Sequence, residues 1–132
     1  IQKSMLALAL LAIVSFLPRL VKSLRKGNMI SIAELKQRLD KKEDFLLLDV
    51  RTEEDYNGEQ GHITGSRLIP LEQLQQHIDE LTDYMEKPVI TICRTDRKST
   101  KAAQLLSQKG FTDVHVVKMG MTDWLKHKYP VK

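Results

Sequence analysis

The chain has 132 residues, enough for one domain, and its side chains are 42% hydrophobic and 29% charged. This composition excludes a collagen-like or low-complexity chain, and the single cysteine excludes an internal disulfide or a zinc module built on several cysteines. The net charge of +4 comes from the first 28 residues, which hold five basic side chains and no acidic one. Beyond them, 16 basic groups face 17 acidic ones, so we expect no nucleic-acid binding.

An uncharged, almost wholly apolar segment covers residues 5–17, and a basic run follows Pro18. The segment is shorter than the ~20 residues that span a bilayer. Because the chain opens on Ile1 and not on Met, we expect the natural sequence to begin upstream, which leaves room for a longer span. It has no polar face and no small-x-small cleavage site after it, which favours a membrane anchor over a buried helix or a signal peptide. The basic run predicts that the following domain lies on the cytoplasmic side of the inner membrane. A soluble cytoplasmic protein is the alternative. Residues 1–28 are thus predicted to be an apolar helix and basic linker.

Strand-like and helix-like segments alternate through the rest of the chain, residues 29–132. Ser31 followed by Glu34 is typical of the capping box that begins a helix, and continuous apolar runs are typical of strands covered on both sides. We expect strands at 45–50, 67–71, 89–93 and 114–117, and helices from Ser31, at 71–81, at 99–109 and at 121–127. This alternation predicts an α/β fold with a central parallel sheet and helices on both faces.

Reactive side chains follow two of the expected strands. Asp49 and Arg51 end the first strand, and Cys93 begins the segment that joins strand 89–93 to the next helix. Ligands bind outside the carboxyl ends of parallel strands, and the backbone N–H groups at the start of a helix attract anions. The residues after the cysteine are all polar, and we take them as a candidate anion-binding loop: Arg94, Thr95, Asp96, Arg97, Lys98 and Ser99.

A cysteine in this position is predicted to be a nucleophile. An ordinary thiol is only ~3% ionised at pH 7, and a helix N-terminus with nearby cations favours the thiolate. The same donors would bind an anionic substrate. The alternative is a buried cysteine that acts as a small apolar side chain, but the polar residues after Cys93 favour a position at the mouth of the loop. We expect no metal and no organic cofactor.

Four stretches of the sequence resemble the rhodanese-homology family of sulfurtransferases, in the family's order. They are LLLDVRTEEDY (46–56), GHITGSRLIPL (61–71), VITICRTDRKSTKAAQLLSQKGFTDVHVV (89–117) and GMTDWLKHKYPV (120–131). The resemblance implies a rhodanese-like domain over residues 29–132. It also implies that Cys93 takes sulfane sulfur as a persulfide from a donor such as thiosulfate and passes it to cyanide or a thiol. Asp49 and Arg51 match the family's Asp-Val-Arg, and we expect them to position the loop by hydrogen bonds.

The chain departs from the family at Asp96, where glycine is frequent. We expect this carboxylate to pair with Arg94 or Arg97 and to disfavour a second anion. Residues 57–60 look like a small insertion where a substrate would approach. A phosphatase or arsenate reductase needs an arginine six residues after the cysteine, where this chain has Ser99, so that class is disfavoured. A non-catalytic docking or sensing module is the remaining alternative.

Overall fold

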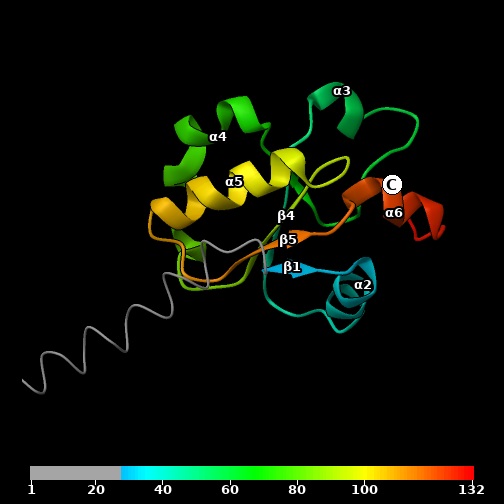
Figure 1. Cartoon of the computed structure of the whole chain (residues 1–132), viewed down its shortest axis with the longest axis horizontal. Coiled ribbons are helices and arrows are strands. Elements are labelled where there is room, and N and C mark those ends of the chain that lie inside the picture. Colours follow the sequence, from blue (N-terminus) through cyan, green and yellow to red (C-terminus); the bar gives the residue numbers. More distant parts are fainter. Residues whose placement is uncertain (1–27) are drawn as a thin grey trace, which may run out of the picture.

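A parallel five-stranded sheet forms the centre of the computed structural model, which describes residues 28–132 (Figure 1). The strands lie in the order β1-β5-β4-β2-β3, and every neighbouring pair is parallel. The α/β architecture expected from the sequence is therefore confirmed. The strands are β1 (Met29–Ile30), β2 (Leu46–Asp49), β3 (Arg67–Leu68), β4 (Val89–Ile92) and β5 (Val114–Val117).

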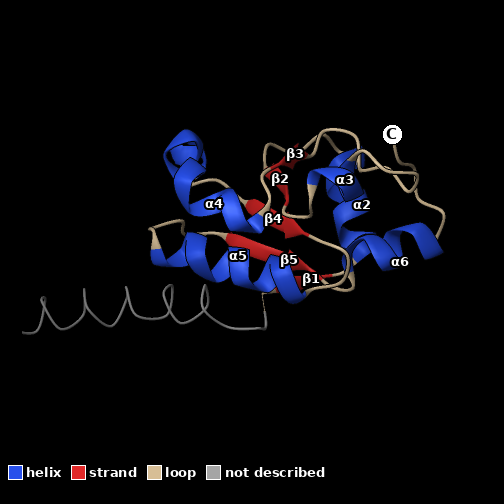
Figure 2. Cartoon of the chain, turned by 90° about the horizontal axis from the view of Figure 1, so that it is seen from above, coloured by secondary structure: helices blue, strands red, loops and turns tan. Residues whose placement is uncertain are grey.

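Helices cover both faces of this sheet, as Figure 1 and, from above, Figure 2 show. They are α2 (Ile32–Asp40), α3 (Glu53–Tyr56), α4 (Leu71–His77), the 3₁₀ helix η1 (Ile78–Tyr84), α5 (Arg97–Gln108) and α6 (Gly120–Lys126). Side chains of α4, η1 and α5 pack into one apolar core, and side chains of α2 and α6 pack into a second core. Each face of the sheet therefore has its own core.

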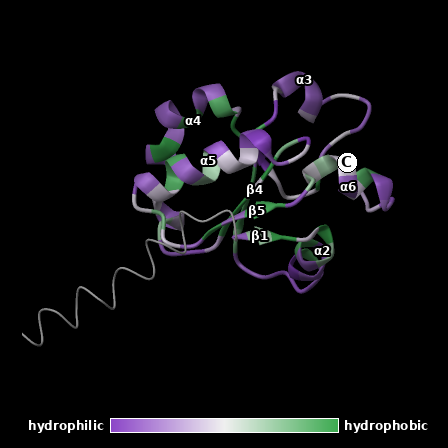
Figure 3. Ribbon diagram, in the orientation of Figure 1, coloured by the Kyte–Doolittle hydropathy of each residue, from purple (hydrophilic) through white to green (hydrophobic). Residues whose placement is uncertain are grey.

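The two central strands explain why the sheet is covered on both sides. All four residues of β2 and all four of β4 are buried, and hydrophobic colour runs along the strands in Figure 3. Alternate side chains point to opposite faces: Val89 belongs to the core under α5, whereas Ile90 and Ile92 belong to the core under α2 and α6. This alternation fixes the face on which each residue at the strand ends lies.

The structure refines the elements expected from the sequence. Ser31 caps α2, since its hydroxyl accepts a hydrogen bond from the Glu34 amide at 3.1 Å, and the Glu34 carboxylate lies 3.8 Å from Arg38. The helix expected over 71–81 changes from α to 3₁₀ form at Ile78. β1 and α3 were not expected from the sequence. The two residues of β1 stand directly before the Ser31 cap, and the four residues of α3 include no buried one, so neither leaves an apolar pattern of its own.

The predicted membrane anchor at residues 5–17 lies outside the described residues. The longest helix between residues 28 and 132 is α5, with 12 residues, whereas a membrane-spanning helix needs about 20. Within that range, no helix has the length and hydrophobicity to cross a bilayer.

Candidate functional site

Cys93 follows the last residue of β4 and lies on the α5 face of the sheet. Strand alternation places its side chain in the same core as Val89, and the residue is only 2% exposed. The expected position at the mouth of the loop is therefore wrong. The polar residues that follow are a property of the loop surface, whereas the strand directs the cysteine inward and the chain then turns over it into α5.

Among the residues that the structure describes, Ser99 supplies both polar partners of the Cys93 sulfur. The Ser99 amide donates to Sγ at 3.3 Å, and the thiol donates to the Ser99 hydroxyl oxygen at 3.3 Å. Ser99 is fully buried, and the hydroxyl of Thr91 donates to its carbonyl oxygen at 2.9 Å. A serine hydroxyl rotates freely, so it can donate to the sulfur once the thiol has lost its proton. Ser99 can therefore offer a thiolate two donors, its backbone N–H and its rotated hydroxyl.

Between Cys93 and α5, three consecutive backbone amides have no acceptor. In the part of the chain that the structure describes, the N–H groups of Arg94, Thr95 and Asp96 donate to no other group. The carbonyl groups beside them are bonded, since the Met121 amide donates to the Cys93 carbonyl and the Thr122 amide to the Arg94 carbonyl, both at 2.9 Å. Unpaired amides at the start of a helix form a concentrated anion-binding surface.

The charged side chains of this loop do not neutralise one another. Arg94 and Arg97 are exposed, and neither has a carboxylate within 4.0 Å among the residues described. The expected pairing of Asp96 with one of these arginines is therefore wrong. Lys98 instead lies 3.4 Å from Glu72 of α4. The pKa of Glu72 is lowered, chiefly by a hydrogen bond to backbone and further by Lys98.

Asp49 and Arg51 form a buried ion pair at the end of β2. They are 0% and 4% exposed, and the Arg51 guanidinium donates to the Asp49 carboxylate at 2.8 Å and to the Gly61 carbonyl at 3.0 Å. The hydrogen bonds of this pair join the two side chains to each other and the guanidinium to the carbonyl groups of Gly61 and Asp55, so the expected hydrogen bonds to the cysteine loop are wrong. Asp49 lies two residues after Leu47 and faces the α2 and α6 core, on the opposite side of the sheet from Cys93.

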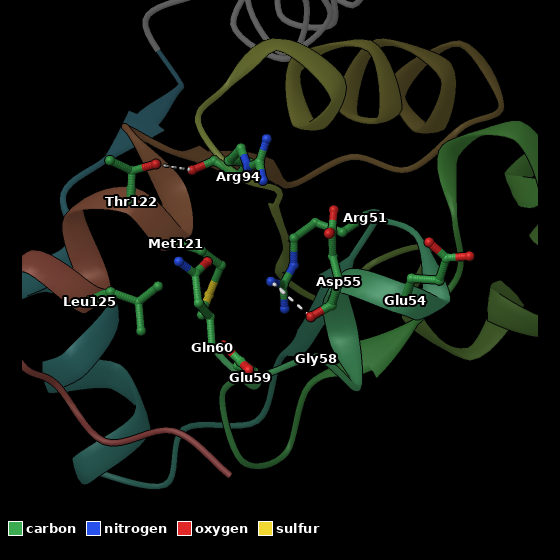
Figure 4. Close-up of a pocket in the computed structure, with 10 residues that line it drawn as sticks. All are labelled: Arg51, Glu54, Asp55, Gly58, Glu59, Gln60, Arg94, Met121, Thr122 and Leu125. Atoms are coloured by element: carbon green, nitrogen blue, oxygen red, sulfur yellow. Dashed lines mark hydrogen bonds between the residues drawn. The ribbon is translucent and has the colours of Figure 1, made fainter.

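A cavity of about 480 Å³ lies beside the loop (Figure 4). Its walls are Arg51 and Arg94, residues of α3, the 58–60 segment and one side of α6, while Cys93 does not line it. The segment taken as an insertion at 57–60 thus forms part of this wall. Within residues 28–132, no group of three histidine, cysteine or acidic side chains could hold a metal ion.

Sequence reasoning assigned no role to the start of α6, although its first three residues all contact the loop. Gly120, Met121 and Thr122 lie against the carbonyl groups of residues 93–95. Most of these contacts involve only backbone atoms, so side-chain chemistry gave no signal for them. The one available signal was Gly120, which stands immediately before the helix expected at 121–127.

Comparison with known proteins gives a consistent result. Residues 31–127 match the rhodanese-like domain family. The putative sulfur carrier protein YrkF of Bacillus subtilis is 38% identical over 95 residues, which are 72% of this chain and 49% of YrkF, so the chain spans about half of that relative. Thiosulfate sulfurtransferase GlpE of Pseudoalteromonas translucida is 34% identical over 95 residues, 72% of this chain and 86% of GlpE. A crystal structure of a rhodanese-related protein from Thermoplasma volcanium has a TM-score of 0.68 and 28% identity, and the match covers 79% of this chain and 96% of that one.

Proposed function

Since the chain belongs to the rhodanese-like family, we propose that it is a sulfurtransferase in which Cys93 carries sulfane sulfur as a persulfide. The observation that carries this proposal is the set of unpaired amides at Arg94, Thr95 and Asp96, next to a cysteine whose sulfur already accepts a hydrogen bond from Ser99. Preorganised donors of this kind stabilise negative charge on a covalent intermediate.

The reaction has two displacement steps. The Cys93 thiolate, whose proton has gone to solvent, attacks the outer sulfur of thiosulfate. A new S–S bond forms, the S–S bond of thiosulfate breaks, and sulfite leaves with the electron pair. A thiolate or cyanide then attacks the outer sulfur of the persulfide. The products are an acceptor persulfide or thiocyanate, and the Cys93 thiolate is regenerated, so no metal or redox partner is consumed.

The loop residues have distinct proposed roles. The amides of Arg94 to Asp96 and the two donors of Ser99 stabilise the charge on the cysteine and its persulfide. The exposed guanidinium groups of Arg94 and Arg97 attract the anionic donor to the loop. Lys98 contributes less, because Glu72 holds its charge on the α4 side.

The burial of Cys93 limits the size of the donor. At 2% exposure, only the terminal sulfur of a slender donor can approach Sγ without displacing the loop. The added sulfur extends the side chain by one atom toward the acceptor. Small sulfur anions and polysulfides are therefore the proposed donors, and small thiolates or cyanide the proposed acceptors.

A mass measurement tests the proposal. The protein contains one cysteine, so any sulfur gained on incubation with thiosulfate or a polysulfide is assigned without mapping. We expect the mass of the wild type to rise by one sulfur atom and to return to its starting value on addition of cyanide. Cys93→Ser is expected to gain nothing. A wild type that stays unmodified, or a serine variant that gains sulfur equally, would contradict the proposal.

A non-catalytic docking or sensing module is the second candidate, and the burial of Cys93 favours it. In that case the wild type would gain no sulfur from either donor. A phosphatase would instead hydrolyse a model aryl phosphate, but Ser99 occupies the position where that class needs its arginine.

A further inference from the structure

The first turn of α6 is bonded to the cysteine loop at two successive carbonyl groups. The Met121 amide donates to the Cys93 carbonyl at 2.9 Å. The Thr122 hydroxyl donates to the Arg94 carbonyl at 2.9 Å (Figure 4), and the Thr122 amide donates to the same oxygen, also at 2.9 Å. The backbone and the side chain of Thr122 thus donate to the same loop oxygen, that of Arg94.

Gly120 brings α6 as close to the loop as a backbone allows. A Cβ atom at this position would lie 2.2 Å from the Cys93 carbonyl oxygen and 2.6 Å from the Thr95 carbonyl oxygen. Gly120 also has a positive φ of 38°, and Met119 before it has φ of 59°. Two successive residues in this region turn the chain sharply after β5. The turn presses the start of α6 against three consecutive carbonyl groups of the loop, those of residues 93–95.

The direction of these carbonyl groups fixes the direction of the unpaired amides. No described peptide bond is cis, and in a trans peptide the N–H points opposite to the C=O of the preceding residue. The carbonyl groups of residues 93–95 face α6, so the N–H groups of Arg94, Thr95 and Asp96 point away from it. A rotated peptide would turn a carbonyl oxygen toward the anion and repel it.

We infer that the first turn of α6 acts as a clamp that sets the orientation of the loop amides, and that Thr122 is a positioning residue for sulfur transfer. This inference rests on the proposed function and adds the element that prepares the site. The Thr122 hydroxyl is exposed and contributes nothing to either core, so its contribution is the bond to the Arg94 carbonyl. That bond fixes the peptide that carries the Thr95 amide.

Matched threonine variants test the clamp in the whole chain. Thr122→Val keeps the shape of the side chain and removes the hydroxyl, whereas Thr122→Ser keeps the hydroxyl. Thr112→Val is the control, because the Thr112 hydroxyl also donates to a backbone carbonyl, that of Met85, at the opposite end of α5 from the loop. The measurements are the second-order rate of sulfur uptake from thiosulfate and the amide NMR signals of the free protein.

We expect Thr122→Val to lower the rate of sulfur uptake about fivefold, the size of one exposed hydrogen bond. Thr122→Ser should recover the rate to within about twofold of the wild type, and Thr112→Val should leave it unchanged. The Thr95 amide signal should move in Thr122→Val and return in Thr122→Ser.

An unchanged rate in Thr122→Val, an equal loss in Thr112→Val, or a serine variant as slow as the valine variant would overturn the clamp. The amide signals need no substrate. If the wild type takes up no sulfur, the proposed function fails, and the clamp then stands or falls on whether the Thr95 signal moves.

Discussion

Two neighbouring strand ends carry charged residues and use them in opposite ways. At the end of β2, Asp49 and Arg51 are buried, and their charged groups are bonded to each other and to the carbonyl groups of Gly61 and Asp55. At the end of β4, three amides have no acceptor within residues 28–132, and the arginines beside them are exposed and unpaired. Polar groups whose hydrogen bonds are satisfied within the fold have little capacity left for a ligand, whereas preorganised donors left unpaired next to a nucleophile are available to one. Polarity at a strand end is therefore a weaker sign of function than unused hydrogen-bonding capacity.

The largest expected effect is on the saturated strand end. Asp49→Ala leaves the buried Arg51 guanidinium without its counter-charge, and we expect the free energy of unfolding to fall by about 3–5 kcal/mol. Urea unfolding measures this loss. The double variant Asp49→Leu with Arg51→Met should recover most of it, because no charge stays buried. If the folded fraction of Asp49→Ala took up sulfur much more slowly than the wild type, the contrast between the two strand ends would be wrong, because the Asp49–Arg51 pair would then also serve sulfur transfer.

Gly120→Ala should damage the unsaturated strand end. The new Cβ would lie 2.2 Å from the Cys93 carbonyl oxygen, so the loop must move, and we expect the rate of sulfur uptake to fall about a hundredfold, as for a misplacement of 1 Å. Gly65→Ala is the control, because Gly65 also has a positive φ, 89°, but a Cβ there meets no atom within 4 Å. Equal rates in the two variants would show that the close approach of α6 is unimportant.

Substitutions at Asp96 test whether the charge or the shape of this side chain limits the rate of thiosulfate turnover. The Asp96 φ of −143° is negative, so this backbone does not require the left-handed conformations that favour glycine. The carboxylate should instead repel anionic donors, and we expect both Asp96→Gly and Asp96→Asn to raise thiosulfate turnover about fivefold, the size of a water-screened charge contact. An unchanged or lower rate, or a gain with glycine alone, would contradict the role of the charge.

The smallest effect should come from the contact between Glu72 and Lys98. The pKa of Glu72 is lowered in the folded protein, so the carboxylate stabilises the fold above its ordinary pKa, and this stabilisation is lost as pH falls through the lowered value. Glu72→Gln should therefore lower the thermal unfolding midpoint slightly at pH 7. At a pH below the lowered pKa of Glu72, the variant and the wild type should have the same midpoint. A difference that grows on acidification would have the wrong sign.

Sequence patterns predicted the sheet and its covering helices because buried strands and amphipathic helices leave continuous or periodic apolar runs, such as 45–50 and 71–81. They did not predict the burial of Cys93, because the polarity of residues 94–99 says nothing about the direction of the side chain before them. The hydrogen-bond partners of Asp49 were not predicted for a related reason. The strand directs the Asp49 side chain to the face opposite Cys93, and the residue types at the strand end do not reveal this direction. The α6 contacts were missed because they are made mainly by backbone atoms.

The central claim is that the amides of Arg94, Thr95 and Asp96 hold the charge of a persulfide on Cys93. Amide NMR spectra of the protein before and after loading with one sulfur atom test it most directly. We predict that these three signals move downfield on loading and return when cyanide removes the sulfur. A persulfide that forms while all three signals stay in place would contradict the claim.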